Sequence, residues 1–242
     1  MRRLNLKLAL ATLAIAAAAP ATAAIVFSTN FDGALAPQIS GAGALTTAGT
    51  LPVGQFGTGT YRNATTGNPA PSTILSLAGL AAHSTVSISF DFIAWDSWDG
   101  RVASFPQGDF FNMLLDGLNV FTISPNIQSG IALIPPSAVL TFGAGGVNYG
   151  QSGFNDQVYR VTLSGLSHSA ATLNLNMFAN GVGWQGGDDE SWGIDNLVVS
   201  TEGAIVGAIP ESSTWMMMLI GFGIVGGSLR TRGGSRRVLQ KF

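Results

Sequence analysis

The sequence predicts an all-β fold, an antiparallel β-sandwich of the jelly-roll type with about eight or more strands. Its central segment contains several runs in which apolar and polar residues alternate. Alternation places one face of a strand toward a core and the other toward solvent. Glycine-containing stretches at short intervals supply the turns between these runs. We find no strong strand-length repeat, which makes a solenoid or a propeller less favoured.

The alternating runs give the expected strands in chain order. Residues 26–32 are expected to form the first strand and residues 192–199 the last. The first lies just after an apolar N-terminal segment, and the last precedes the C-terminal tail. Asp116-Gly117 supplies a turn in the middle of the chain. The remaining expected strands are residues 85–92, 111–115, 158–163 and 172–177.

Composition limits the possible functions of the chain. There is no cysteine among its 242 residues, so disulfides, thiolate metal sites and a cysteine nucleophile are excluded. Between residues 25 and 209 only three basic residues, all arginines, stand against twelve acidic ones. This segment offers no basic surface for a phosphate backbone, and nucleic acid is therefore not an expected partner.

The N-terminal segment has the features of a secretory signal peptide. Arg2, Arg3 and Lys7 precede an apolar run over residues 8–19, and small residues follow at positions 21–23. A positive start, a short apolar helix and small residues at the cleavage site are what export requires. We expect residues 1–24 to be removed, and residues 25–203 to form the sandwich.

The C-terminal segment predicts a short membrane helix. After a linker at residues 204–208, residues 215–229 form an uncharged run that ends in arginines. Such a helix measures about 22 Å, less than a hydrocarbon core of ~30 Å. Basic residues are retained on the cytoplasmic side of a membrane. We therefore expect an anchor over 215–229 and a basic cytoplasmic end at 238–242.

The tail over residues 209–237 resembles the PEP-CTERM sorting signal, also catalogued as the ice-binding-protein C-terminal domain. In that family a Pro-Glu-Pro motif, a short membrane helix and a basic end are recognised by exosortase, a membrane peptidase. This tail departs from the motif at Ser212, where the family has its second proline. The resemblance implies export, transient membrane anchoring and a final place at the cell surface or outside the cell. The residues that carry it are Pro210, Glu211, Trp215, Gly221, Gly223, Arg230 and Arg232.

Residues 25–200 are similar to concanavalin-like lectins and carbohydrate-binding modules. The similarity lies in "FDG" near residue 32, "DSWDG" at 96–100 and "ESWGIDNLVV" at 190–199. In such jelly rolls the terminal strands lie side by side. The resemblance implies a sandwich whose first and last strands pair.

Clustered acidic residues predict a structural calcium site. Asp-x-x-Asp-Gly at 96–100 can turn two carboxylates toward one ion, and Ca²⁺ takes six to eight hard oxygen ligands. The alternative is that these residues are turn formers and solvated charge. The expected ligands are Asp96, Asp99, Asp109 and Asp195, followed by Asp188, Asp189 and Glu190.

Four tryptophans offer a hypothesis for ligand binding. Trp98 and Trp184 lie in glycine-rich segments near acidic residues, where exposed rings would stack on sugars. Trp95 and Trp192 alternate with apolar positions and are expected in the core.

These features together predict a non-catalytic polysaccharide-binding or structural matrix protein. One alternative is an extracellular hydrolase with Asp99 and Glu190 as its carboxyl pair. Another is an ice-binding or adhesion protein, although no regular Thr-x-Thr ladder is present. His83 and His168 each stand just before an expected strand, and we interpret them as turn structure rather than as part of a triad.

Overall fold

The computed structural model describes residues 23–47, 57–101, 108–143 and 153–203, together with Leu219 and Phe222. The described residues contain twelve strands. All of these strands fall within one unit, Ala21–Ala204. They are β1 (Ala24–Thr29), β2 (Ile39–Gly41), β3 (Ala44–Thr47), β4 (Gly59–Asn63), β5 (Thr73–Ala78), β6 (Thr85–Asp96), β7 (Phe110–Leu115), β8 (Leu118–Ile123), β9 (Ala138–Phe142), β10 (Gln157–Ser167), β11 (Thr172–Asn180) and β12 (Glu190–Glu202).

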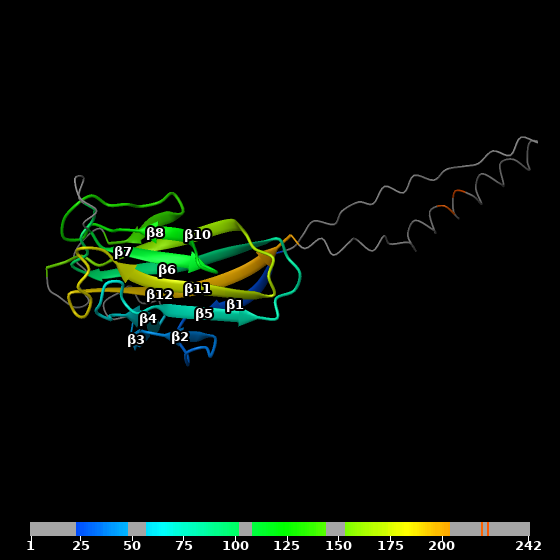
Figure 1. The fold of residues 1–242 in the computed structure, drawn as a ribbon, viewed down its shortest axis with the longest axis horizontal. Helices are drawn as coiled ribbons and strands as arrows, with labels where there is room; N and C mark the ends of the chain where they lie inside the picture. Colours follow the sequence, from blue (N-terminus) through cyan, green and yellow to red (C-terminus); the bar gives the residue numbers. More distant parts are fainter. Residues whose placement is uncertain are drawn as a thin grey trace, which may run out of the picture. The chain divides into compact units, whose positions relative to one another are not determined.

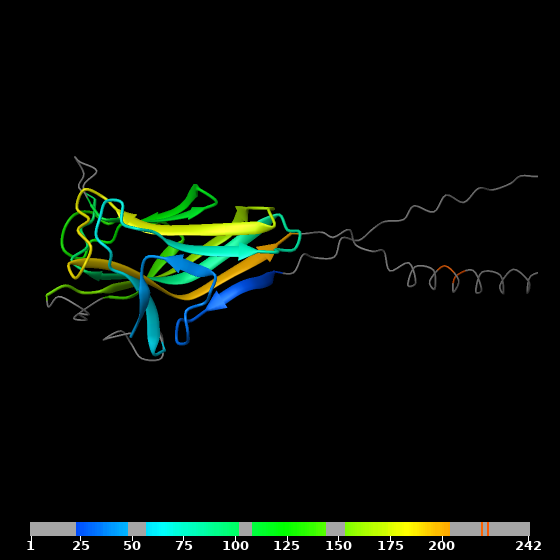
Figure 2. The same ribbon diagram turned by 60° about the horizontal axis from the view of Figure 1, so that its bottom comes forward.

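The strands form two antiparallel sheets that pack face to face (Figure 1). One sheet has seven strands in the order β3-β4-β12-β6-β10-β9, with β1 paired to β12. The other has five strands in the order β2-β5-β11-β7-β8. Figure 2 shows the two layers, with β5 and β11 in one and β1 and β12 in the other. The predicted antiparallel β-sandwich is confirmed.

The core lies between the two sheets and follows from the alternation along the strands. On β6 the side chains of Phe90 and Phe92 point inward and are fully buried. The ring of Phe92 packs 4.8 Å from that of Phe111 on β7, in the opposite sheet. Phe111 in turn lies 4.8 Å from Trp192 on β12. Burying such side chains stabilises the fold by roughly 1.5–3 kcal/mol each.

The six strands expected from sequence are all present, with shifted ends. The first and last strands pair as expected, with Phe27 opposite Val199. The first strand ends at Thr29, earlier than expected, because Phe31 adopts a positive φ of 54°. Strands β2 to β5, β8 and β9 were not located from the sequence; β2 and β3 are only three and four residues long, whereas β5 does alternate, with Thr73, Leu75 and Leu77 buried.

Strand β6 is buried on both faces over its second half, which the alternation does not predict. Ile93 and Trp95 point away from the main core and pack with Val158 of β10. Trp192 lies in the main core as expected. Trp95 is buried as expected, but it belongs to this second cluster on the outer face of the seven-stranded sheet.

The expected signal peptide and sorting tail lie almost entirely outside the described residues. Of the tail's proposed helix only Leu219 and Phe222 are described, and both are helical and exposed. Within the described residues, no helix combines the length and the apolar character needed to cross a bilayer. The sorting-signal residues named above are not described.

Candidate functional site

Three carboxyl groups converge at one end of the sandwich. Asp99 follows β6, Asp109 immediately precedes β7, and Glu190 is the first residue of β12. One oxygen from each lies within 4.8 Å of the others. The backbone brings them together, because the N–H of Asp109 donates to the carbonyl of Asp99 at 2.8 Å. Glu190 is also paired with Asp96, at the end of β6.

Each of the three carboxyl groups accepts a hydrogen bond from a backbone N–H or a hydroxyl group. The N–H of Asp99 donates to Asp109 Oδ2 at 2.6 Å. The N–H of Gln185 donates to Glu190 Oε2 at 2.9 Å. Ser129 Oγ donates to Asp99 Oδ1 at 2.5 Å. The opposite oxygens, Asp109 Oδ1 and Glu190 Oε1, are buried and accept no hydrogen bond from an N–H or hydroxyl donor of the described residues.

Burial makes ionisation of two of these groups unfavourable. It raises the pKa of Glu190 to about 8, and the negative charge of Asp109 acts in the same direction. Burial also raises the pKa of Asp109 to about 6, with a contribution from the charge of Asp99. Without a cation, this arrangement favours a proton shared between Asp109 and Glu190. A divalent cation would compensate both charges instead.

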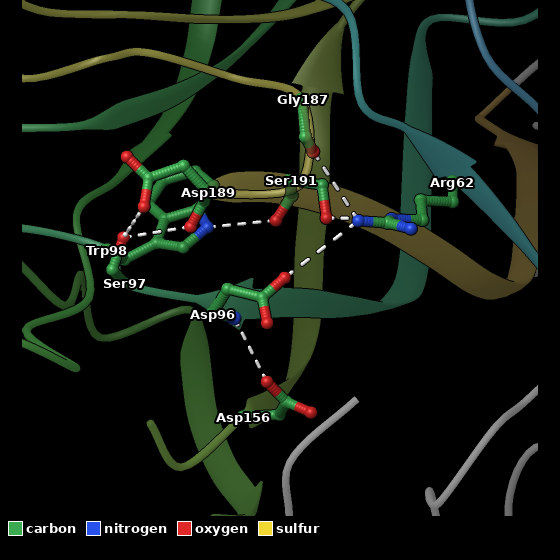
Figure 3. A network of polar contacts seen from close by, with 8 residues as sticks. All are labelled: Arg62, Asp96, Ser97, Trp98, Asp156, Gly187, Asp189 and Ser191. Carbon is green, nitrogen blue, oxygen red and sulfur yellow. Dashed lines mark hydrogen bonds and ion pairs between the residues drawn. The ribbon is translucent and has the colours of Figure 1, made fainter. Parts of the chain in front are cut away.

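Asp96, an expected ligand, does not join the three carboxyl groups. Its φ of 70° turns the chain at the end of β6. Its N–H donates to Asp156 Oδ1 at 3.0 Å, and its Oδ2 lies 3.8 Å from Arg62 Nη2 (Figure 3). Asp96 therefore faces a guanidinium group and stands apart from the cluster of Asp99, Asp109 and Glu190.

Asp195 is also separate from the three carboxyl groups. It lies five residues along β12 from Glu190, a distance of roughly 16 Å in an extended strand. A bulge follows Asp195, where Asn196 adopts a φ of 49° and donates its N–H to Asp195 Oδ1 at 2.6 Å. Burial raises the pKa of Asp195 to about 7, and the charges of Asp91 and Asp32 add to this effect.

The consecutive residues Asp188, Asp189 and Glu190 lie in three different environments. Asp188 is exposed. Asp189 connects two segments, because Ser97 Oγ donates to its Oδ1 at 3.0 Å and Ser97 N–H donates to its carbonyl at 3.0 Å (Figure 3). Only Glu190 contributes to the three-carboxyl group. Sequence reasoning ranked it behind Asp195, although its place at the start of the last strand was a usable signal.

Trp98 and Trp184 do not present free rings for sugar stacking. Trp98 is 0% exposed and Trp184 is 6% exposed. Their rings meet edge to face at 5.3 Å, and Trp98 also packs against Phe92. Trp98 Nε1 donates to the carbonyl of Ser191 at 2.8 Å. The hypothesis required exposed rings, but the segments that carry these residues fold over the end of the core.

The outer face of the seven-stranded sheet carries a polar network that sequence reasoning missed. Arg160 on β10 contacts Asp91 on β6 at two points, with Nε–Oδ1 at 2.5 Å and Nη2–Oδ2 at 2.8 Å. Asn196 Nδ2 donates to Asp91 Oδ2 at 2.9 Å. Asp91 is fully buried, whereas the Arg160 side chain is 48% exposed. The available signal was that Arg160 is one of only three basic residues in the segment.

A second arginine extends this outer face toward the carboxyl groups. Arg62 on β4 donates from Nε to Ser191 Oγ at 2.8 Å, and its guanidinium lies 5.6 Å from the centre of the Trp95 ring. Figure 3 shows Arg62 pointing toward Asp96 and Ser191. Gly193 makes room for Trp95, since a β-carbon there would lie 2.4 Å from the ring. The arginine is thus fixed by contacts on several sides.

The two histidines form a pair, which their separate positions in the sequence did not predict. His83 Nε2 lies 2.6 Å from His168 Nδ1, and the rings stack at 4.9 Å. His168 Nε2 lies 2.9 Å from Asp116 Oδ2. The pairing of Thr85 with Ser167 at the ends of β6 and β10 brings the histidines together. Both are buried beside turns, in agreement with a structural interpretation.

Comparison with known proteins finds likeness only among solved structures. No family model matches the chain, and no curated protein matches it. A xylan-binding domain from CBM 22 is 10% identical, with 75% of this chain and 97% of that domain covered and a TM-score of 0.39. The CBM22-1 xylan-binding domain from Paenibacillus barcinonensis Xyn10C is 11% identical, with coverage of 77% and 99% and a TM-score of 0.37. The CBM22-2 domain of the same protein is 14% identical, with coverage of 72% and 98% and a TM-score of 0.34.

Proposed function

We propose that this chain is a non-catalytic polysaccharide-binding β-sandwich whose ligand contacts the outer face of the seven-stranded sheet. The observation that carries the proposal is the half-exposed guanidinium of Arg160, held at two points by the buried carboxylate of Asp91. An arginine fixed in this way keeps donors available for neighbouring hydroxyl groups, and it loses little side-chain freedom on binding. Asn196 lies beside it and adds a further polar group.

The carboxyl geometry supports the non-catalytic part of the proposal. The two catalytic carboxyl groups of a glycosidase lie about 5–9.5 Å apart, on either side of the glycosidic bond that is cleaved. In the pair considered from sequence, Glu190 is 1% exposed, and one of its oxygens lies within 4.8 Å of an oxygen of Asp99. A sugar ring has no room between these groups.

Affinity electrophoresis tests the proposed binding face. The full chain should be retarded in gels that contain a soluble acidic or neutral polysaccharide, and a glycan array identifies which one to use. Arg160→Gln should weaken the retardation about tenfold or more, since it removes a charged, pre-positioned donor. Arg101→Gln is the matched control, because Arg101 is exposed and belongs to none of the twelve strands.

The possible outcomes distinguish the proposal from its alternatives. Retardation that is equal in both variants would place the ligand elsewhere on the molecule. Retention by no glycan would favour a purely structural matrix role. Release of shortened sugars from the panel would favour the hydrolase.

We also propose that the chain is exported and sorted to the cell surface through its tail. The basic start and apolar run of residues 1–24, and the motif order over residues 209–237, support this. The partner would be an exosortase-type peptidase, and the tail would be a transient membrane anchor. Mass spectrometry of the released protein should find a start near Ile25 and no peptide from the tail. A secreted form that ends in Phe242 would contradict cleavage.

A further inference from the structure

We propose that Asp99, Asp109 and Glu190 bind one divalent cation, of the hard, oxygen-seeking class to which Ca²⁺ belongs. The site would join three separate parts of the chain, namely the segment after β6, the start of β7 and the start of β12. It is independent of the glycan face, because Arg160 and Asp91 belong to a different part of the sheet.

The buried oxygens are the first argument for a cation. Asp109 and Glu190 are 0% and 1% exposed, and each leaves one oxygen, Oδ1 and Oε1, without a donor among the described residues. Buried polar atoms in folded proteins are almost always satisfied. Two such acceptors in one cluster, with the Asp99 carboxylate as its third member, point to a shared positive partner.

The hydrogen bonds give the second argument, because they orient the carboxyl groups. Asp109 Oδ2 and Glu190 Oε2 each accept a backbone N–H, from Asp99 and Gln185. These bonds restrain the two carboxyl groups and leave Asp109 Oδ1 and Glu190 Oε1 as the candidate ligand atoms. Gly183 leaves room beside one of these atoms, since a β-carbon there would lie 2.9 Å from Asp109 Oδ1.

The spacing gives the third argument. Ca²⁺ binds oxygen at about 2.3–2.6 Å, so two opposite ligands lie up to about 4.6–5.2 Å apart. One oxygen from each of the three residues falls within 4.8 Å of the others, inside that span. Asp99 is only partly buried, which leaves a side through which the ion and its remaining water ligands can enter.

Titration of the purified full chain tests the site directly. After EGTA treatment and dialysis, CaCl₂ at pH 7.5 should bind with one equivalent at this site, as measured by calorimetry. Saturating Ca²⁺ should raise Tm by several degrees, because the ion binds the folded state and not the unfolded one. Absence of both effects, with MgCl₂ and MnCl₂ as well, would overturn the proposal and leave a shared proton between Asp109 and Glu190.

Two variants with a matched control locate the binding. Asp109→Asn and Glu190→Gln keep the side-chain shape and remove one charge, and each should weaken Ca²⁺ affinity at least about tenfold. Asp188→Asn removes an exposed charge next to Glu190 in sequence and should keep the wild-type affinity. Wild-type affinity in both Asp109→Asn and Glu190→Gln would place the ion elsewhere and overturn the assignment. If one of them fails to fold, the other carries the test.

Discussion

Arg160 and Asp91 form a two-point ion pair across β10 and β6, with nitrogen–oxygen distances of 2.5 and 2.8 Å. The two residues lie directly opposite each other in the antiparallel register. The carboxylate is fully buried, while the guanidinium is half-exposed. Arg160 thus pairs with a buried carboxylate inside the sheet, and its exposed half is the part that we propose contacts a ligand.

We predict that Arg160→Ala lowers the free energy of unfolding by about 1–3 kcal/mol, because among the described residues it leaves the buried Asp91 carboxylate with the Asn196 side chain as its remaining side-chain partner. Urea denaturation followed by tryptophan fluorescence measures the change. Arg101→Ala, which removes an exposed arginine, should change the value by less than about 0.5 kcal/mol. An equal effect of the two variants would mean that the ion pair contributes nothing to the fold.

Gly193 leads to a prediction about packing on the outer face. A β-carbon at this position would lie 2.4 Å from Trp95 Cζ3 and 2.5 Å from the carbonyl oxygen of Tyr61. Gly193→Ala should therefore force β4 and β12 apart and lower stability by about 1–3 kcal/mol or more. Gly33→Ala is the control, since a β-carbon there meets nothing within 4 Å. Thermal unfolding of both variants measures the difference, and an unchanged Tm in Gly193→Ala would contradict the packing.

Trp98 is predicted to act through stability rather than through direct ligand contact. Trp98→Ala removes a fully buried ring and its hydrogen bond to Ser191, which should cost about 3–5 kcal/mol. Trp98→Phe, which keeps most of the apolar volume, should recover much of that loss. If the protein remains fully stable in Trp98→Ala but no longer binds glycan, the ring contacts the ligand after all. Chemical denaturation and affinity electrophoresis of the same samples separate the two cases.

The sequence predicted the position of a strand where that strand has a clear alternation of apolar and polar residues. Alternation located β6, β10, β11 and β12, because each of them places one apolar face on a shared core. It could not predict that Glu190 meets Asp99 and Asp109, since that depends on the register of β12 against β6 and on the hydrogen bond from the Asp109 N–H to the Asp99 carbonyl.

Burial of the aromatic residues was equally hard to predict. Local composition suggested that Trp98 lies in an open loop, yet the loop folds back so that the indole binds the carbonyl of Ser191. The Arg160–Asp91 pair required knowledge of which residues face each other across two strands about 70 positions apart. A single sequence shows the alternation within each strand, but it does not show which residues of distant strands lie opposite each other.

The buried carboxyl of Asp195 predicts how stability depends on pH. Its Oδ2 accepts no hydrogen bond from the described residues, and its pKa is raised from 3.8 to about 7. Burial is the largest cause, the charges of Asp91 and Asp32 add to it, and Arg160 opposes it. Because the folded state holds this proton more tightly than the unfolded one, its contribution to stability is complete below about pH 4. That contribution is lost as pH rises through about 7.

In buffer with EGTA, we expect the Tm of the wild type to fall between pH 5 and pH 7.5. Asp109 and Glu190 act in the same direction, since their pKa values are raised too. Comparison with Asp195→Asn isolates the contribution of Asp195, because an amide does not titrate. The variant should show a shallower fall and should gain stability relative to the wild type as pH rises. Parallel Tm curves for the two proteins across this range would show that Asp195 ionises in the folded state as easily as in the unfolded one, contrary to its burial beside Asp91.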